Sequence, residues 1–175
     1  DYVSGDAANS WQMLEQDIAC IKKLHNNAYR FSLEWSRIEP QEGRFDQVAI
    51  DAYKKFVQDL RSQGIEPFVT LWHWTFPLWV WQKGGFESKN NFAHFVNFAE
   101  RMARELDVTY WLTVNEPHIY ADNSYLYGEW PPQRTSRRLR NRIVFNLIKA
   151  HKAVYTGIKR IKPDAKVGIA KNNNY

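Results

Sequence analysis

The chain has 175 residues, of which 44% are hydrophobic and 25% charged, with 24 Lys and Arg against 19 Asp and Glu. This size and composition predict one folded domain over residues 1–175, and they exclude a disordered tail, a collagen, a coiled coil and a disulfide-rich scaffold. No apolar run approaches the roughly 20 residues of a membrane-spanning helix, so we expect no membrane partner. The single cysteine, Cys20, cannot form an internal disulfide, which fits a reducing, cytoplasmic location. The first residue is Asp1 rather than Met, so we expect that the chain was processed or cut from a longer one.

Helical and strand patterns alternate along the chain. In chain order, the sequence predicts a helix over 10–25, a strand over 28–33, a helix over 46–63, a strand over 67–71, a helix over 88–105, a strand over 109–114, a helix over 138–161 and a strand over 166–170. Asp46 is expected to cap the second helix, and Ser88 lies near the start of the third. A helix between every pair of apolar strands predicts a parallel sheet with its strands in the order of the sequence.

The segments that follow the strands are long and carry Trp, Pro, His, Asn and Glu. In parallel α/β folds, the chemistry lies at the carboxyl ends of the strands. The segment WLTVNEP at 111–117 places Asn115 and Glu116 at such an end. A carboxyl beside aromatic side chains has its charged form desolvated, which raises its pKa and suits it to donate a proton. From these residues alone, Glu116 is equally well an ordinary loop carboxylate.

A second aromatic segment, TLWHWTFP at 70–77, follows the neighbouring strand, and four of the eight tryptophans lie between 72 and 81. Aromatic faces stack on the apolar faces of sugar rings, and a histidine can bind sugar hydroxyls. Taken singly, His73 is more often a structural histidine, and tryptophans such as Trp74 are more often part of a core.

Arg30 and Glu34 share a parity along the first strand, so we expect them on the same face. The structural interpretation of this pair is an ion pair. The five histidines lack metal-ligand spacing, and no glycine-rich phosphate loop is present, so we expect neither a metal nor a cofactor.

Basic residues gather between Arg134 and Lys162, with five arginines close together at 134, 137, 138, 140 and 142. Such a group is either a nucleic-acid footprint or the solvated face of a helix. The second interpretation is favoured because no nucleic-acid motif accompanies the arginines, so we expect no nucleic-acid partner.

Taken together, the aromatic and polar segments resemble glycoside hydrolase family 1, the β-glucosidase and β-galactosidase family. The segments that carry the resemblance are YRFSLEWSRIEP at 29–40, GIEPFVTLWHWTFP at 64–77, KGGF at 83–86, YWLTVNEP at 110–117 and YLYGEWPP at 125–132. The resemblance implies a (β/α)8 (TIM) barrel that hydrolyses β-glycosides with retention. It covers strands two to five of that barrel, so we expect a partial, half TIM barrel of about four parallel βα units.

The resemblance also implies roles for single residues. Glu116 corresponds to the general acid/base and Asn115 to the residue that binds the sugar 2-hydroxyl. His73 and Trp74 correspond to sugar-contacting residues, and Arg30 to the arginine that positions the nucleophile. The family nucleophile belongs to the seventh strand, which lies outside the resemblance.

Two functions therefore stay open: a β-glycoside hydrolase of weak or assembly-dependent activity, and a non-catalytic carbohydrate-binding or structural fragment of a longer glycosidase. In the first, Glu34 is the best second carboxylate, about 9–10 Å from Glu116 before the side chains lean together, because strands lie about 4.8 Å apart. A half barrel has two free edges and an open inner face, so we expect a homo-oligomer, most simply a two-fold dimer, that covers the open side.

Overall fold

The computed structural model describes residue 5 and residues 7–173. Four strands form one sheet, and their three pairings are all parallel. The strands are β1 (Ala28–Ser32), β2 (Glu66–Trp72), β3 (Tyr110–Asn115) and β4 (Lys166–Ala170). Their spatial order is β1-β2-β3-β4, so the predicted parallel sheet in sequence order is confirmed.

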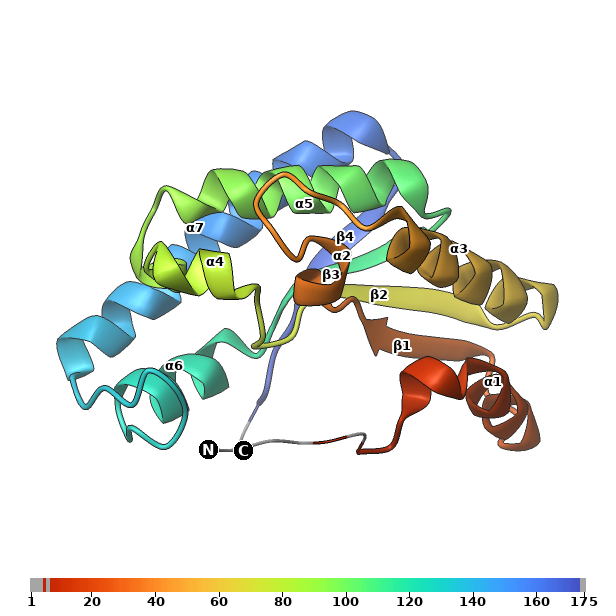
Figure 1. Ribbon diagram of the computed structural model, residues 1–175, viewed down its shortest axis with the longest axis horizontal. Coiled ribbons are helices and arrows are strands. Elements are labelled where there is room, and N and C mark those ends of the chain that lie inside the picture. Colours follow the sequence, from red (N-terminus) through yellow and green to blue (C-terminus); the bar gives the residue numbers. More distant parts are fainter. Residues whose placement is uncertain (1–4, 6, 174–175) are drawn as a thin grey trace.

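The longer helices are α1 (Leu14–Lys23), α3 (Gln47–Ser62), α5 (Asn91–Glu105) and α7 (Arg137–Ile161). Helices α3, α5 and α7 cover one face of the sheet, and α1 lies beside β1 at the edge (Figure 1). The cap prediction for α3 is confirmed, because the Asp46 side chain accepts a hydrogen bond from the Ala49 amide at 3.1 Å. The first helix starts later than predicted because a 3₁₀ turn, η1 (Ser10–Gln12), occupies its predicted first turn. The third helix starts at Asn91 rather than residue 88, and a second 3₁₀ turn, η2 (Gly85–Glu87), lies before it.

Three shorter helices were not predicted. They are α2 (Trp35–Ile38), α4 (Leu78–Gln82) and α6 (Pro117–Tyr125). Helices of four to nine residues show too few turns to display a periodic apolar pattern. Each of them follows a strand, so all three lie at the carboxyl edge of the sheet, where the candidate residues are.

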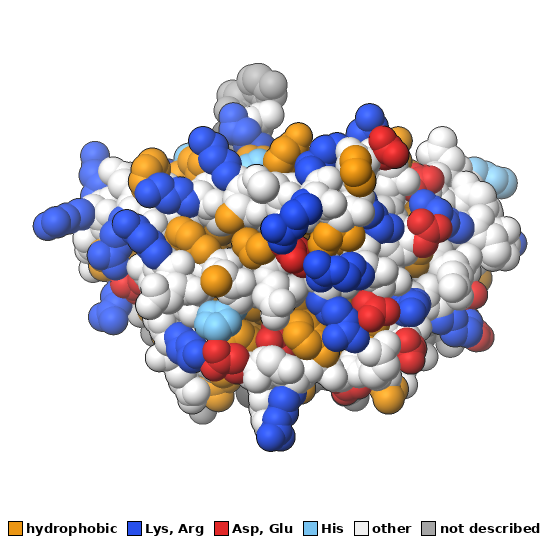
Figure 2. Space-filling view, turned by 90° about the horizontal axis from the view of Figure 1, so that it is seen from above, with side chains coloured by type: hydrophobic (Ala, Val, Ile, Leu, Met, Phe, Trp, Pro, Cys, Tyr) orange, Lys and Arg blue, Asp and Glu red, His pale blue; other side chains and the backbone are white. Residues whose placement is uncertain are grey.

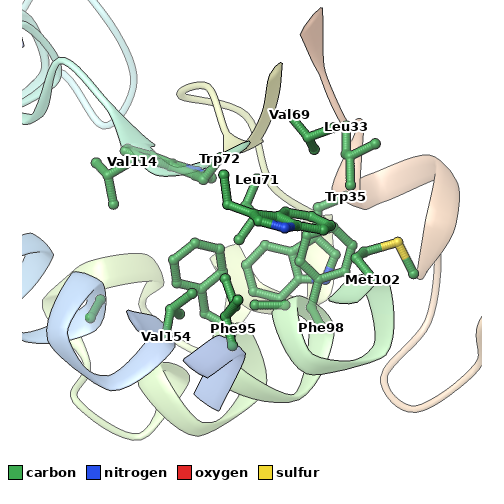
Figure 3. Close-up of a cluster of buried hydrophobic side chains, with 14 of the residues drawn as sticks. Leu33, Trp35, Val69, Leu71, Trp72, Phe95, Phe98, Met102, Val114 and Val154 are labelled. Carbon is green, nitrogen blue, oxygen red and sulfur yellow. The ribbon is translucent and has the colours of Figure 1, made fainter. Parts of the chain in front are cut away.

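The core fills the space between the sheet and the helices that cover it (Figure 3). Trp35 of α2 stacks on Phe98 of α5 with 5.0 Å between the ring centroids, and Phe95 lies beside them. Val69 and Leu71 of β2 are fully buried against this cluster. Burial of one such side chain contributes about 1.5–3 kcal/mol, so this cluster fixes the position of the loop that follows β1.

The opposite face of the sheet is not covered by any helix in the described part of the chain (Figure 1). Phe68 and Tyr110 stack there with 4.3 Å between their ring centroids, and with Leu112 they line an open cavity of about 300 Å³. Within the described residues β1 and β4 each pair with one neighbour only. The molecule thus has an open concave face and two free strand edges.

Lysine and arginine side chains are spread over the helix-covered face, with Asp and Glu among them (Figure 2). Arg140 pairs with Asp122 at 2.5 Å and Arg142 with Glu87 at 3.1 Å. Two arginines of the basic group therefore serve ion pairs within the fold. Across residue 5 and residues 7–173, no helix combines the length and the apolarity that crossing a membrane requires.

Candidate active site

Residues from three neighbouring strands meet at the carboxyl edge of the sheet. Asn115 is the last residue of β3, and Glu116 follows it. His73 and Trp74 follow β2 directly, while Arg30 lies within β1 and reaches across β2. The fold thus brings together five residues that lie up to 86 positions apart in the sequence, Arg30 and Glu116 being the most distant.

The backbone of Glu116 has φ 42°, in the left-handed region that non-glycine residues seldom adopt. Its N–H donates to the carbonyl of Ala170 at 2.8 Å, and its carbonyl accepts the first helical bond from Tyr120 at 3.3 Å. Pro117 then opens α6, where its missing N–H is harmless. A left-handed non-glycine residue costs about 1–3 kcal/mol, and such strain clusters at functional sites.

The carboxylate of Glu116 is half-buried, and no side chain among the described residues donates a hydrogen bond to it. Its negative charge reaches the imidazole of His73, where it acts to raise the pKa of that ring. A half-buried carboxyl with no internal partner is open to exchange a proton with a bound molecule.

Asn115 is held at both its side chain and its backbone. Its Oδ1 accepts from Arg30 Nη1 at 3.0 Å, and its carbonyl accepts from Trp74 Nε1 at 3.0 Å. The β3–β4 pairing shifts register between Leu112 and Asn115. A bulge changes the alternation of side chains, which lets Asn115 share the face of Arg30. Asn115 is 2% exposed, so its position is fixed by packing as well as by hydrogen bonds.

His73 is half-buried and lies edge-on to the ring of Trp74, with 4.8 Å between the centroids. Its Nδ1 is 2.9 Å from the hydroxyl of Ser32 at the end of β1. Burial, and then the positive charge of Arg30, lower the pKa of His73, and Glu116 opposes this in part. The ring is therefore neutral near pH 7, with one N–H and one acceptor nitrogen. Trp74 itself has φ 77°, so the loop after β2 is also strained.

Arg30 and Glu34 form no ion pair with each other among the described residues, because Arg30 binds Asn115. Strand β1 ends at Ser32, so the alternation of side chains does not extend to Glu34, which instead caps α2. Its Oε1 accepts from the amide and the hydroxyl of Ser36 at 3.2 and 2.5 Å, and its Oε2 accepts from the Thr75 hydroxyl at 3.0 Å. The Glu34 carboxylate thus links the segment after β1 to the segment after β2.

An apolar cavity of about 470 Å³ adjoins this group on the side of Trp74. The indole of Trp130 lies against that of Trp74, with 4.7 Å between the ring centroids. Aromatic side chains dominate the wall of the cavity; they are Trp74, Phe76, Trp81, Tyr120 and Trp130. The volume is within the range of sites that hold small molecules.

Three residues of the site were not singled out from the sequence: Ser32, Thr75 and Trp130. All three lie in the segments that carry the family resemblance, but only the contacts across strands reveal what they touch. Within residue 5 and residues 7–173, no group of three or more His, Cys, Asp or Glu side chains could hold a metal ion.

Comparison with known proteins places this arrangement in a family. Beta-glucosidase A of Thermotoga maritima is 35% identical over 176 aligned residues, which cover 99% of this chain and 39% of the relative. A 1,4-beta-D-glucan glucohydrolase of Thermotoga neapolitana is 32% identical, with 99% of this chain and 41% of the relative covered. The chain therefore spans about two fifths of the length of these relatives.

Solved structures agree with the sequence relatives. The beta-glycosidase from Pyrococcus horikoshii matches with a TM-score of 0.88 at 39% identity, over 94% of this chain and 38% of that one. The Thermotoga maritima beta-glucosidase in complex with glucoimidazole matches with a TM-score of 0.91 at 34% identity, over 95% and 38%. These matches confirm the predicted partial TIM barrel. The family profile described as Glycosyl hydrolase family 1 matches residues 1–175, and the chain belongs to that family.

Proposed function

We propose that the chain provides the acid/base side of a β-glycosidase of the β-glucosidase type, with Glu116 as the group that protonates the leaving oxygen. The observation that carries this proposal is the placement of Glu116. It is half-buried beside Asn115 and His73, and its carboxylate has no donor among the described residues. The relatives that are named as beta-glucosidases support the substrate class, a β-glycoside.

The neighbouring residues bind the sugar in this proposal. Asn115 turns its Oδ1 toward Arg30, which leaves its NH₂ group to donate to a hydroxyl. His73 contributes a ring nitrogen, and Trp74 provides an aromatic face beside it. The apolar cavity next to Trp74 receives the group on the far side of the scissile bond.

Hydrolysis also needs a second carboxylate, which this proposal does not assign to a residue of the chain. The family nucleophile belongs to a strand outside the resemblance, and both oxygens of Glu34 already accept hydrogen bonds. We therefore expect the activity of the 175-residue chain to be weak or to depend on assembly. Loss of one essential group costs several orders of magnitude in rate.

The test is hydrolysis of two β-glucosides that differ in leaving group, by the chain and by its Glu116→Gln variant. An amide cannot donate the proton, so kcat should fall about 10²–10⁴-fold for a poor leaving group. A dinitrophenyl glucoside needs little protonation and should be affected far less. Glu129→Gln, at an exposed glutamate of the following loop, is the matched control.

Equal losses on both substrates would show that Glu116 is not the acid. Activity that Glu116→Gln leaves unchanged would come from a contaminating glycosidase or another site. Glycoside binding without hydrolysis, lost in Asn115→Ala, would instead favour a carbohydrate-binding role.

We further propose that a second copy of the chain covers the open concave face in a two-fold dimer. Four strands are half of an eight-stranded barrel, and the free edges of β1 and β4 allow each copy to pair with the other. Exposed apolar side chains lie on β4 and on α7, which contacts β4; they are Ile169 on β4 and Phe145, Ile148 and Tyr155 on α7. Sedimentation at micromolar concentration should give a dimer that Ile169→Lys disrupts and Val48→Lys, at an exposed position on α3, does not. A soluble monomer would overturn this proposal.

A further inference from the structure

The contact between Ser32 and His73 has a consequence for how the histidine can bind a ligand. Ser32 Oγ lies 2.9 Å from His73 Nδ1. Ser32 ends β1 and pairs in register with Thr70, while His73 follows the last residue of β2. The contact therefore joins the last residue of β1 to the first residue after β2, at the carboxyl edge of two adjacent parallel strands.

A neutral imidazole carries one N–H, and the bond made by one nitrogen decides which nitrogen holds the proton. Burial and the charge of Arg30 keep the His73 ring neutral near pH 7. Across the described residues, the Ser32 hydroxyl has one hydrogen-bonding partner, His73 Nδ1. The 2.9 Å contact fits two arrangements: the serine donates to Nδ1 and the imidazole proton lies on Nε2, or Nδ1–H donates to the serine oxygen.

We propose that Ser32 is a positioning residue that holds the proton of His73 on Nε2. The ring then presents an N–H to an oxygen of the bound molecule. This role rests on the proposed function, since the ligand class is the β-glycoside and the acceptor is one of its hydroxyl oxygens. Without the serine, Nδ1–H and Nε2–H forms compete, and a part of the molecules offers a lone pair where a donor is needed.

The proton position is measured directly by ¹⁵N NMR of the imidazole nitrogens, with Ser32→Ala and Ser32→Thr as a matched pair. Threonine keeps the hydroxyl and suits a strand position. In the unaltered chain and in Ser32→Thr, His73 should be in the Nε2–H form. Ser32→Ala should give a mixture of both forms. A dominant Nδ1–H form in the unaltered chain, or an unchanged ratio in Ser32→Ala, would overturn the proposal.

Kinetics or binding then tests the consequence for the ligand. Loss of one neutral hydrogen bond should raise KM about 2–10-fold in Ser32→Ala, with kcat within about twofold, and Ser32→Thr should restore KM. Unchanged KM in Ser32→Ala, while hydrolysis still depends on Glu116, would overturn this proposal and leave the proposed function intact. If the Glu116→Gln test fails, the proposed function is refuted instead. The NMR measurement of the His73 proton does not depend on the outcome of that test.

Discussion

Arg30 donates a hydrogen bond from Nη1 to Oδ1 of Asn115 at 3.0 Å, and this bond crosses the strand that separates them in the sheet. Arg30 is in β1 and Asn115 ends β3, with β2 between them. The guanidinium can only donate, so the amide oxygen must face it and the amide NH₂ group must face away. One arginine thus selects the orientation in which Asn115 offers a donor to a ligand.

Replacing Arg30 with methionine should release this orientation. Arg30→Met keeps an unbranched stem and removes every donor, so we expect KM for a nitrophenyl β-glucoside to rise about tenfold, consistent with the loss of one charged hydrogen bond. Arg138→Met, at an exposed position on α7, is the control and should leave KM unchanged. If Arg30→Met behaves like the control, the amide orientation does not depend on the arginine.

A double-mutant cycle should show that Arg30 and Asn115 act as one unit. Asn115→Ala alone should raise KM by an amount worth about 1–3 kcal/mol. Once Asn115 is alanine, Arg30→Met should add little, because the interaction it served is gone. Fully additive effects of the two substitutions would mean that the two residues meet the ligand separately.

Glu34 should matter for stability more than for turnover. Its Oε1 caps α2 at Ser36, and loss of a helix cap typically costs about 1 kcal/mol. Glu34→Ala should therefore lower the free energy of unfolding by about 1 kcal/mol in urea titrations. Glu34→Gln keeps an oxygen that can accept from the Ser36 amide, so it should cost less, with kcat nearly unchanged. A drop in kcat of about 100-fold or more in Glu34→Gln at unchanged stability would identify it as the second carboxylate instead.

Gly157 of α7 is expected to resist substitution. A Cβ there would lie 2.8 Å from Oε1 and 3.2 Å from Cγ of Glu100, a buried residue that pairs with Arg104 and Arg160. In an exposed helix, glycine to alanine gains about 1 kcal/mol. Here overpacking should outweigh that gain, so Gly157→Ala should be destabilising by about 1 kcal/mol. Glu100→Ala should relieve the clash, so Gly157→Ala should cost little in a chain that already carries Glu100→Ala. If Gly157→Ala lowers the free energy of unfolding as much in that background as in the unaltered chain, this explanation is contradicted.

Stability should fall as the solution becomes mildly acidic. Burial lowers the pKa of His151, whose Nδ1 lies 2.7 Å from the Thr113 hydroxyl, and Lys152 lowers it further; the pKa of His73 is lowered as well. The unfolded chain has an ordinary histidine pKa of about 6.5, so below that pH it binds protons that the folded chain resists. The free energy of unfolding should therefore decrease from pH 7 toward pH 5.

Urea midpoints measured across that range test this expectation. His151→Gln should flatten the decrease, because the buried imidazole no longer titrates. His25→Asn, at an exposed residue with φ 55° that asparagine tolerates, should keep the original slope. A slope that is the same in all three proteins would assign the pH dependence to other groups.

Local patterns in the amino-acid sequence are enough to predict the alternation of helices and parallel strands and the edge of the sheet at which the polar residues gather. These features follow from local periodicity, since apolar residues three or four apart define a helix and short β-branched or aromatic runs define a strand. The same local periodicity is enough to predict that Asn115 and Glu116 lie at the end of the third strand. The short helices α2, α4 and α6 were not predicted, because so few turns show no apolar periodicity.

Which side chains contact one another depends on how the strands pair and pack. Arg30 was matched with Glu34 because they lie four residues apart, yet it binds Asn115, which is 85 residues away. Ser32 and His73 are 41 residues apart and touch because β1 and β2 pair in one particular register. Such contacts depend on strand register, on a shift in the β3–β4 ladder and on the residue at which β1 ends. Those properties arise from packing of the whole sheet, and no local pattern in the sequence contains them.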